Sequence, residues 1–243
     1  MLKVIVPSRG RPEAALQLIN AVADTRQIHS TGLVFSVDDD DPNLDLYREV
    51  CGTRPDVAQI DVVKATGWMV GALNQTAYAI AANPQVTEIG FMGDDHRPRT
   101  RGWDASYLSA LTEMGAGIVY GDDLLQHDFV PTQCAMSASI IRTLGWMAHP
   151  TLKHMYVDTF WRDIGTVAGR LRYLPDVVVE HLHYINNKAV EDEGYKRVNA
   201  ASVFTADEQA FRNLHASGQI KMAGRVINQL ALAALSRTDR RRL

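Results

Sequence analysis

The feature that most limits what this chain can fold into is a repeating pair of segments in its first half. Short runs of β-branched and other apolar residues alternate with longer stretches in which apolar residues recur every three or four positions. The runs predict buried strands and the stretches amphipathic helices, so their alternation predicts a mostly parallel α/β sheet with helices on both faces. The predicted strands are 4–6, 33–37, 60–63, 88–92 and 117–120, and the predicted helices are 13–23, 70–82 and 105–114.

The second half has a different pattern. Residues 137–144 and 157–167 predict helices, and residues 170–174 and 177–183 predict a small β-hairpin around Pro175-Asp176. Residues 186–199 are polar and predict a mobile loop, and two helices, 205–215 and 220–235, close the chain. We expect one domain, in which residues 1–184 form the main body and residues 185–243 form the loop and a helical appendage.

Composition excludes several classes of protein. Hydrophobic residues make up 46% and charged residues 22%, and the net charge of −3 does not predict a broad nucleic-acid-binding surface. No apolar run has the length of a signal peptide or a membrane span. Cys51 and Cys134 form neither a metal-type spacing nor a disulfide framework, which predicts a reducing, cytoplasmic compartment.

Polar clusters follow four of the predicted strands. In open parallel sheets ligands bind outside the carboxyl ends of the strands, so clusters at that edge predict a binding site. The clusters are Ser8-Arg9-Gly10-Arg11, Asp38 to Asp41, Asp94-Asp95-His96 and Asp122-Asp123.

Three of the motifs offer metal or proton chemistry. Asp94, Asp95 and a histidine could supply ligands to Mg²⁺ or Mn²⁺, although carboxylates at a strand end also cap turns. His181 and His183 share one face of a predicted strand. They could be two metal ligands, or two histidines at the surface of an edge strand. Asp158 stands at the start of a predicted helix, as an N-cap or as a general base.

The loop after the first strand offers a phosphate contact. Arg9 and Arg11 carry guanidinium groups suited to bidentate phosphate binding, although an ordinary surface loop could have the same composition. The loop lacks the glycine patterns of a P-loop or a Rossmann dinucleotide site. Trp103 is expected in the core, whereas Trp68 could be a core residue or a sugar-stacking surface.

Taken in order, these motifs resemble the GT-A glycosyltransferases, in particular the large family-2-like group. The resemblance covers about residues 3 to 184 and rests on their succession. The motifs are VIVPSRGRP (residues 4–12), SVDDDDP (36–42), GWMVGALNQTAYAIA (67–81), FMGDDH (91–96), MYVDTFWRDIG (155–165) and RLRYLPDVVVEHLHY (170–184).

The resemblance implies a metal-dependent enzyme that moves a hexosyl group from a UDP- or GDP-linked sugar to an acceptor hydroxyl. Inversion is expected if Asp158 is the base, and a retaining reaction is the alternative. FMGDDH stands where that group has its D-x-D motif. In one register Gly93 replaces the first aspartate, and in the other Asp94-Asp95-His96 has the D-x-H form that also occurs in GT-A enzymes. The resemblance implies donor contacts by Pro7, Ser8, Arg9, Arg11, Asp38, Asp40, Trp68, Asn74 and Asp94. It implies Mn²⁺ or Mg²⁺ held by Asp95 or His96 with His181 or His183, a catalytic base at Asp158, and sugar or acceptor contacts by Asp122 and Asp123.

Two other functions remain open at this point. A sugar-1-phosphate nucleotidyltransferase would share the sheet and the carboxylate-bound metal, but SRGRP has one glycine where such enzymes carry a glycine-rich loop. A nucleotide-sugar-binding module without catalysis would share every motif. The acceptor, whether protein, glycan, lipid or nucleic acid, is not specified by the sequence.

Overall fold

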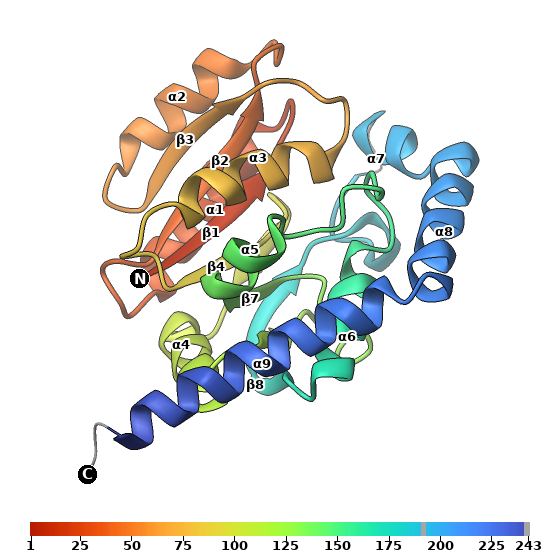
Figure 1. Ribbon diagram of the computed structural model, residues 1–243. Helices are drawn as coiled ribbons and strands as arrows, with labels where there is room; N and C mark the ends of the chain where they lie inside the picture. The colour runs from red at the N-terminus through yellow and green to blue at the C-terminus, as the bar shows by residue number, and fades with distance from the viewer. Residues whose placement is uncertain (191–192, 241–243) are drawn as a thin grey trace.

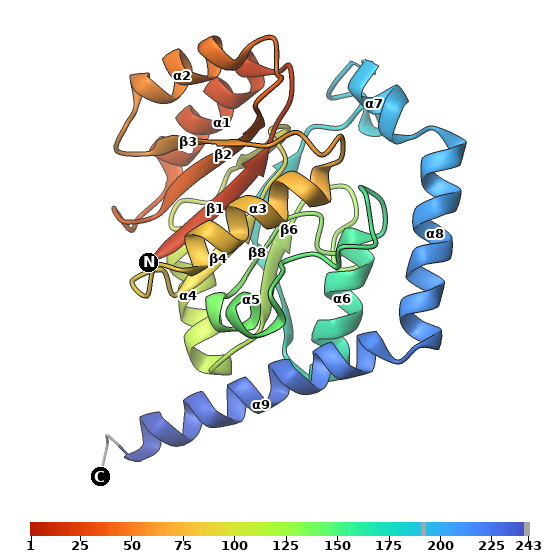
Figure 2. The same cartoon turned by 45° about the horizontal axis from the view of Figure 1, so that its top comes forward.

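The computed structural model describes residues 1–190 and 193–240 as a curled sheet between two layers of helices (Figures 1 and 2). The strands are β1 (Leu2–Pro7), β2 (Gly32–Asp38), β3 (Ala58–Val63), β4 (Glu88–Phe91), β5 (His96–Pro98), β6 (Ile118–Asp122), β7 (Cys134–Ser137) and β8 (Leu171–His181). The helices are α1 (Pro12–Thr25), α2 (Leu44–Thr53), α3 (Met69–Ala81), α4 (Trp103–Met114), α5 (Ala138–Leu144), α6 (Val157–Ala168), the 3₁₀ turn η1 (Tyr184–Asn186), α7 (Glu193–Val198), α8 (Ala201–Ala216) and α9 (Gln219–Arg240).

The strand order across the sheet is β3-β2-β1-β4-β7-β6-β8-β5. Strands β3, β2, β1 and β4 run parallel, β7 is antiparallel to both of its neighbours, and β6 pairs parallel with β8. Strand β5 pairs antiparallel with the end of β8. The sheet is therefore mostly parallel, as predicted, and the carboxyl ends of β1, β2 and β4 meet at one edge.

The two helical layers follow from the alternation of side chains along the strands. In β1, Val4 and Val6 pack in the core beneath α1, α2 and α4, whereas Ile5 packs in the core beneath α3, α5 and α6. Both faces of the sheet are thus covered, which explains why its strands are continuous apolar runs. Trp103 is fully buried in α4, as expected.

The predicted β-hairpin is wrong, because residues 171–181 form one strand. Gly121 pairs with Leu174 and Asp122 pairs with Val178, so the residues between them form a bulge and the chain does not reverse. A Cβ atom on Gly121 would overlap the carbonyl oxygen of Val177, so the bulge depends on a glycine at this position. The turn chemistry of Pro175-Asp176 thus bends the strand without ending it.

The C-terminal helices pack onto the sheet domain. In Figure 2, α9 runs along the lower edge of the molecule and α8 rises from its right-hand end to α7. Ile220, Ala223 and Ile227 of α9 share a core with Trp161 and Ile164 of α6, so α9 packs on the sheet domain through α6. The predicted mobile loop 186–199 includes α7, and its residues 191–192 lie outside the described residues. Within the described chain, none of the helices is both long and apolar enough to cross a membrane.

Candidate active site

A cavity of about 630 Å³ opens at the carboxyl edge of the sheet. Most of the residues predicted from the sequence to form a site line it. They are Pro7, Ser8, Arg9, Arg11, Asp38, Trp68, Asp94, Asp95, His96, Asp158, His181 and His183. The predicted edge of the sheet therefore brings together residues from six separate motifs.

The loop after β1 is fixed by a network of buried hydrogen bonds. Ser8 Oγ donates to Asp94 Oδ2 (2.5 Å) and lies 2.6 Å from the hydroxyl of Tyr47 in α2. The same hydroxyl accepts the backbone N–H of Arg11 (2.9 Å), and the Arg11 guanidinium lies 3.3 Å from Asp94 Oδ1. Burial and the neighbouring Asp95 raise the pKa of Asp94, while Arg11 and Ser8 oppose the shift. The network holds one arginine at the cavity and ties β1 to the end of β4.

The second arginine of this loop pairs with the end of β2. Arg9 Nη1 lies 3.0 Å from Asp38 Oδ2 and also pairs with Asp40. Asp40 does not line the cavity, so its contact with Arg9 orients the guanidinium from outside. Among the described residues, Asp38 Oδ1 is buried without a hydrogen-bond partner, so it remains available to accept an N–H or O–H from a ligand.

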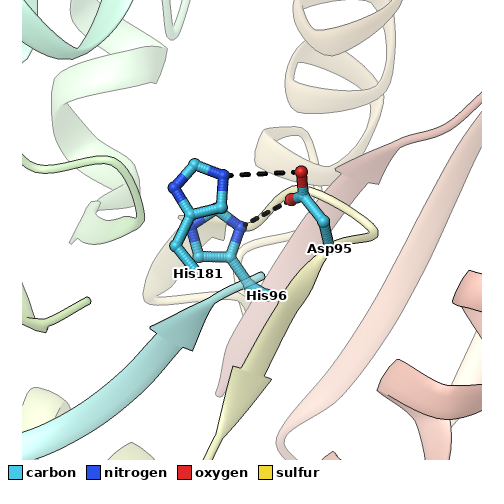
Figure 3. Close-up of side chains that lie close together, drawn as sticks. All are labelled: Asp95, His96 and His181. Carbon is cyan, nitrogen blue, oxygen red and sulfur yellow. Dashed lines mark ion pairs between the residues drawn. The ribbon is translucent and has the colours of Figure 1, made fainter. Parts of the chain in front are cut away.

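A carboxylate and two imidazoles form a compact cluster where β5 pairs with β8. The register places His96 opposite His181 on the neighbouring strand, and the two rings stack with their centroids 4.3 Å apart. Asp95 Oδ1 lies 3.2 Å from His96 Nδ1, and Asp95 Oδ2 lies 3.4 Å from His181 Nε2 (Figure 3). One ligand atom from each of the three residues lies within 4.8 Å of the others. His183 lines the cavity but is not part of this cluster.

The chemistry of the cluster fits a divalent cation. Burial lowers the pKa of His96, which favours its neutral form. Its Nδ1 accepts the backbone N–H of Gly93 (3.0 Å), and its Nε2 is buried without a hydrogen-bond partner among the described residues. A neutral imidazole beside a carboxylate is a donor set that suits a divalent transition metal. A Cβ atom at Gly93 would overlap Asp95 Oδ1, so a side chain at this position would displace that carboxylate. Both Asp95 and His96 therefore face the candidate metal position.

The opposite wall of the cavity begins with Tyr156, the residue before α6. Its φ of +63° is strained for a non-glycine residue, and its ring stacks on Phe211 of α8 at 5.3 Å. Asp158 lies one residue inside the helix, so it is not the N-cap. Its Oδ1 accepts the backbone N–H of Thr159 (2.7 Å), and burial raises its pKa. A carboxylate with a raised pKa facing a cavity suits proton abstraction.

Residues 153–155, which lead into this wall, are held by a buried carboxylate that the sequence did not indicate. Asp207 of α8 is 1% exposed. Its Oδ1 accepts the N–H of Lys153 (3.0 Å), and its Oδ2 accepts those of His154 (2.8 Å) and Met155 (2.7 Å). Burial lowers the pKa of His154, which also lines the cavity, to about 4.

Trp68 lines the cavity, and two cationic side chains lie over its ring. Lys153 Nζ lies 5.2 Å and Arg197 Cζ 5.3 Å from its ring centroid. Arg197, in α7, also donates to the carbonyl oxygen of Gly67 and lines the cavity. The sequence did not indicate Arg197 as a site residue, because nothing in a polar segment predicts which of its side chains folds back.

Besides Asp40, three predicted contact residues lie outside the cavity lining. The amide of Asn74 donates to the carbonyl of Ala148 (2.8 Å) and accepts the N–H groups of Met147 and Ala148, so it fixes that loop instead of facing a donor. Asp122 and Asp123 bond the backbone of the loop that follows them. None of the three therefore has the position expected of a donor or acceptor contact.

Comparisons with known proteins are informative at the level of structure. No protein-family model and no curated protein sequence matches this chain. A mannosyltransferase, PcManGT from Pyrobaculum calidifontis, solved with GDP-Man and Mn²⁺, is similar with a TM-score of 0.64 and 18% identity, covering 98% of this chain and 74% of that one. TarS from S. aureus is similar with a TM-score of 0.58 and 12% identity, covering 84% of this chain and 43% of that one. The TarS fragment 1–349, solved with UDP-GlcNAc, is similar with a TM-score of 0.54 and 14% identity, covering 81% of this chain and 64% of that one.

At these identities the likeness concerns the fold. The chain has the GT-A fold, the fold of nucleotide-sugar glycosyltransferases, which confirms the architecture predicted from the order of the motifs.

Proposed function

We propose that this protein is a metal-dependent glycosyltransferase that moves a hexosyl group from a nucleoside diphosphate sugar to an acceptor hydroxyl. The observation that carries the proposal is the Asp95–His96–His181 cluster, because it lies in the same cavity as the arginines of the β1 loop and Asp158. The donors and Mn²⁺ named for the similar structures make GDP- and UDP-linked sugars the first candidates.

The two ends of the cavity have different roles in this proposal. Asp38 accepts a hydrogen bond from the nucleoside through its unpartnered Oδ1, and Arg9 and Arg11 bind diphosphate oxygens. Asp95, His96 and His181 hold the divalent ion. That ion would supply positive charge to the leaving diphosphate. Two imidazoles beside one carboxylate favour a transition metal such as Mn²⁺ over Mg²⁺.

Asp158 is the general base of this proposal. An acceptor hydroxyl bound beside it transfers its proton to the carboxylate as the oxygen attacks the donor sugar, and the configuration at the anomeric carbon is inverted. Burial raises the pKa of Asp158, which strengthens the carboxylate as a base near neutral pH. The cytoplasmic location predicted from cysteine usage belongs to the same proposal, and both cysteines are free and buried.

The test is to incubate the protein with a panel of UDP- and GDP-sugars and MnCl₂ and to measure turnover as release of the nucleoside diphosphate. We expect release from one donor, loss of release with EDTA, and loss of transfer in Asp158→Asn. A protein that instead releases pyrophosphate from a nucleoside triphosphate and a sugar 1-phosphate would be a nucleotidyltransferase. Donor binding without turnover at any metal concentration would identify a binding module, and either result would refute the proposal.

A further inference from the structure

Asp123 is a buried carboxylate that the proposed reaction leaves without a role. It is 1% exposed and immediately follows β6. Its Oδ1 accepts the backbone N–H groups of Leu125 (2.9 Å), Gln126 (2.6 Å) and His127 (2.9 Å), and its Oδ2 accepts the hydroxyl of Thr132 (2.7 Å). Four hydrogen bonds fix the plane of this carboxylate, so it is a rigid group.

Asp123 also lies next to the candidate metal ligand His181. The backbone N–H of His181 donates to the carbonyl oxygen of Asp123 (2.9 Å), which holds the end of β8 beside the loop. The ring then has Nε2 3.4 Å from Asp95 Oδ2 and Nδ1 3.9 Å from Asp123 Oδ2. Each ring nitrogen therefore faces a different carboxylate, one inside the metal cluster and one outside it.

His181 Nδ1 is buried and makes no hydrogen bond to the described residues. A buried N–H without an acceptor costs about 1–3 kcal/mol, so Nδ1 is expected to acquire a partner in the working state. Contacts that are long in a ligand-free site commonly shorten when the ligand binds. The fixed Oδ2 of Asp123 is the carboxylate oxygen that Nδ1 faces, and a small rotation of the ring would bring the two within hydrogen-bond distance.

We propose that Asp123 is a positioning residue that accepts the Nδ1 proton of His181 and so directs the lone pair of Nε2 toward the metal. Of the proposed function, this inference requires only that the Asp95–His96–His181 cluster binds a metal. A histidine that binds a metal through one nitrogen usually donates its other N–H to a carboxylate or carbonyl, which fixes the orientation of the ring. This assigns Asp123 a role different from the sugar contact expected from the sequence.

The same carboxylate stabilises a strained loop. Leu124 and His127 have φ values of +57° and +52°, which are unfavourable for residues other than glycine. The hydrogen bonds from Leu125, Gln126 and His127 to Asp123 offset this strain. Because Thr132 at the end of the loop lines the cavity, Asp123 also joins the metal ligand to one wall of the site.

The test compares Mn²⁺ affinity, measured by titration without nucleotide, in the parent protein, Asp123→Asn and Asp122→Asn. Asparagine keeps an oxygen for the loop but places an amide N–H₂ opposite His181, so we expect Mn²⁺ affinity to fall about 10- to 100-fold. Asp122→Asn is the matched control, because Asp122 bonds Leu124 and His127 but not His181, and its affinity should stay within about twofold of the parent. Equal affinity in Asp123→Asn and the parent refutes the positioning role alone. A parent protein that does not bind Mn²⁺ refutes the metal centre and this inference together.

A second measurement does not depend on the folding of any Asp123 variant. NMR of the Zn²⁺-loaded parent protein with ¹⁵N-labelled histidine reports which ring nitrogen carries the proton, and His181→Gln identifies the resonances. We expect a proton on Nδ1 and the metal on Nε2. A metal on Nδ1, or no effect of Zn²⁺ on His181, contradicts the proposal.

Discussion

Replacing Asp207 with asparagine tests how the wall of the cavity is held. The carboxylate accepts three backbone N–H groups, from Lys153, His154 and Met155, in a fully buried position. A hydrogen bond to a charged group contributes about 1.5–3 kcal/mol, and asparagine has one oxygen in place of two. At least one N–H therefore loses its acceptor and faces an amide N–H₂. We expect Asp207→Asn to lower the free energy of unfolding by about 2–4 kcal/mol.

The assay is urea unfolding with Glu208→Gln as the matched control. Glu208 pairs with Arg212 at the surface of the same helix, where such a pair is worth about 0.3–0.5 kcal/mol. For a chain of this size, the loss in Asp207→Asn corresponds to a fall in Tm of roughly 4–16 °C. A change in Asp207→Asn as small as that in Glu208→Gln would refute the argument that this carboxylate holds residues 153–155.

Three further predictions concern the site. Asp158→Asn should bind nucleoside diphosphate as tightly as the parent but transfer sugar about 10²–10⁴ times more slowly. The rate of the parent should fall as the pH drops through the raised pKa of Asp158. Full activity in the variant would exclude Asp158 as the base. Burial alone would lower the pKa of His181, but the nearby carboxylates of Asp123 and Asp95 have the larger combined effect and raise this pKa from 6.5 to about 9. The metal-free protein should therefore lose up to about 3 kcal/mol of stability as the pH rises from 6.5 past 9, and a His181→Gln variant with the same pH dependence would contradict this. Arg197→Ala removes a cation from the cavity and from the Trp68 ring, so it should raise the donor KM about tenfold; the neighbouring Lys196→Ala is its control, and equal KM values would exclude the contact.

Strands β1, β2, β3, β4 and β6 and most helices could be predicted because their sequences are periodic and locally consistent, whereas β5 and β7 were not predicted. Val4 to Val6 and Leu33 to Val37 are short apolar runs rich in β-branched residues that predict buried strands, and the polar residues after them are expected at the carboxyl edge of a parallel sheet. Helix α2 was missed although Leu44, Tyr47 and Cys51 are spaced as on one helical face. With that helix, the sequence would have indicated Tyr47 as a support for the loop after β1.

The geometry of the metal cluster could not be predicted from the sequence. Strand β5 has three residues, one of them proline, and no periodicity reveals so short a segment. Its antiparallel pairing with β8 places His96 opposite His181. The sequence could therefore indicate His181 and His183 as equal candidates, whereas the pairing of strands brings only His181 into the cluster.

Residues whose partners lie far along the chain were also beyond prediction. Asn74 has the expected place on α3, but the loop at Met147 and Ala148 takes up its amide. Asp207 stands in an ordinary helical sequence and becomes a buried acceptor only because α8 packs against residues 153–155. Such roles arise from tertiary contacts, for which a single sequence carries no local signal.

The central claim is that the cavity binds a nucleoside diphosphate through a metal held by Asp95, His96 and His181. Calorimetric titration of UDP and GDP into the parent protein and Asp95→Ala, each with Mn²⁺ and with EDTA, tests it most directly. We expect one nucleotide to bind the parent protein with Mn²⁺, and its affinity to fall at least tenfold, about 1.4 kcal/mol, with EDTA or in Asp95→Ala. Equal affinity in all four conditions, or no binding of either nucleotide, would contradict the assignment of the site.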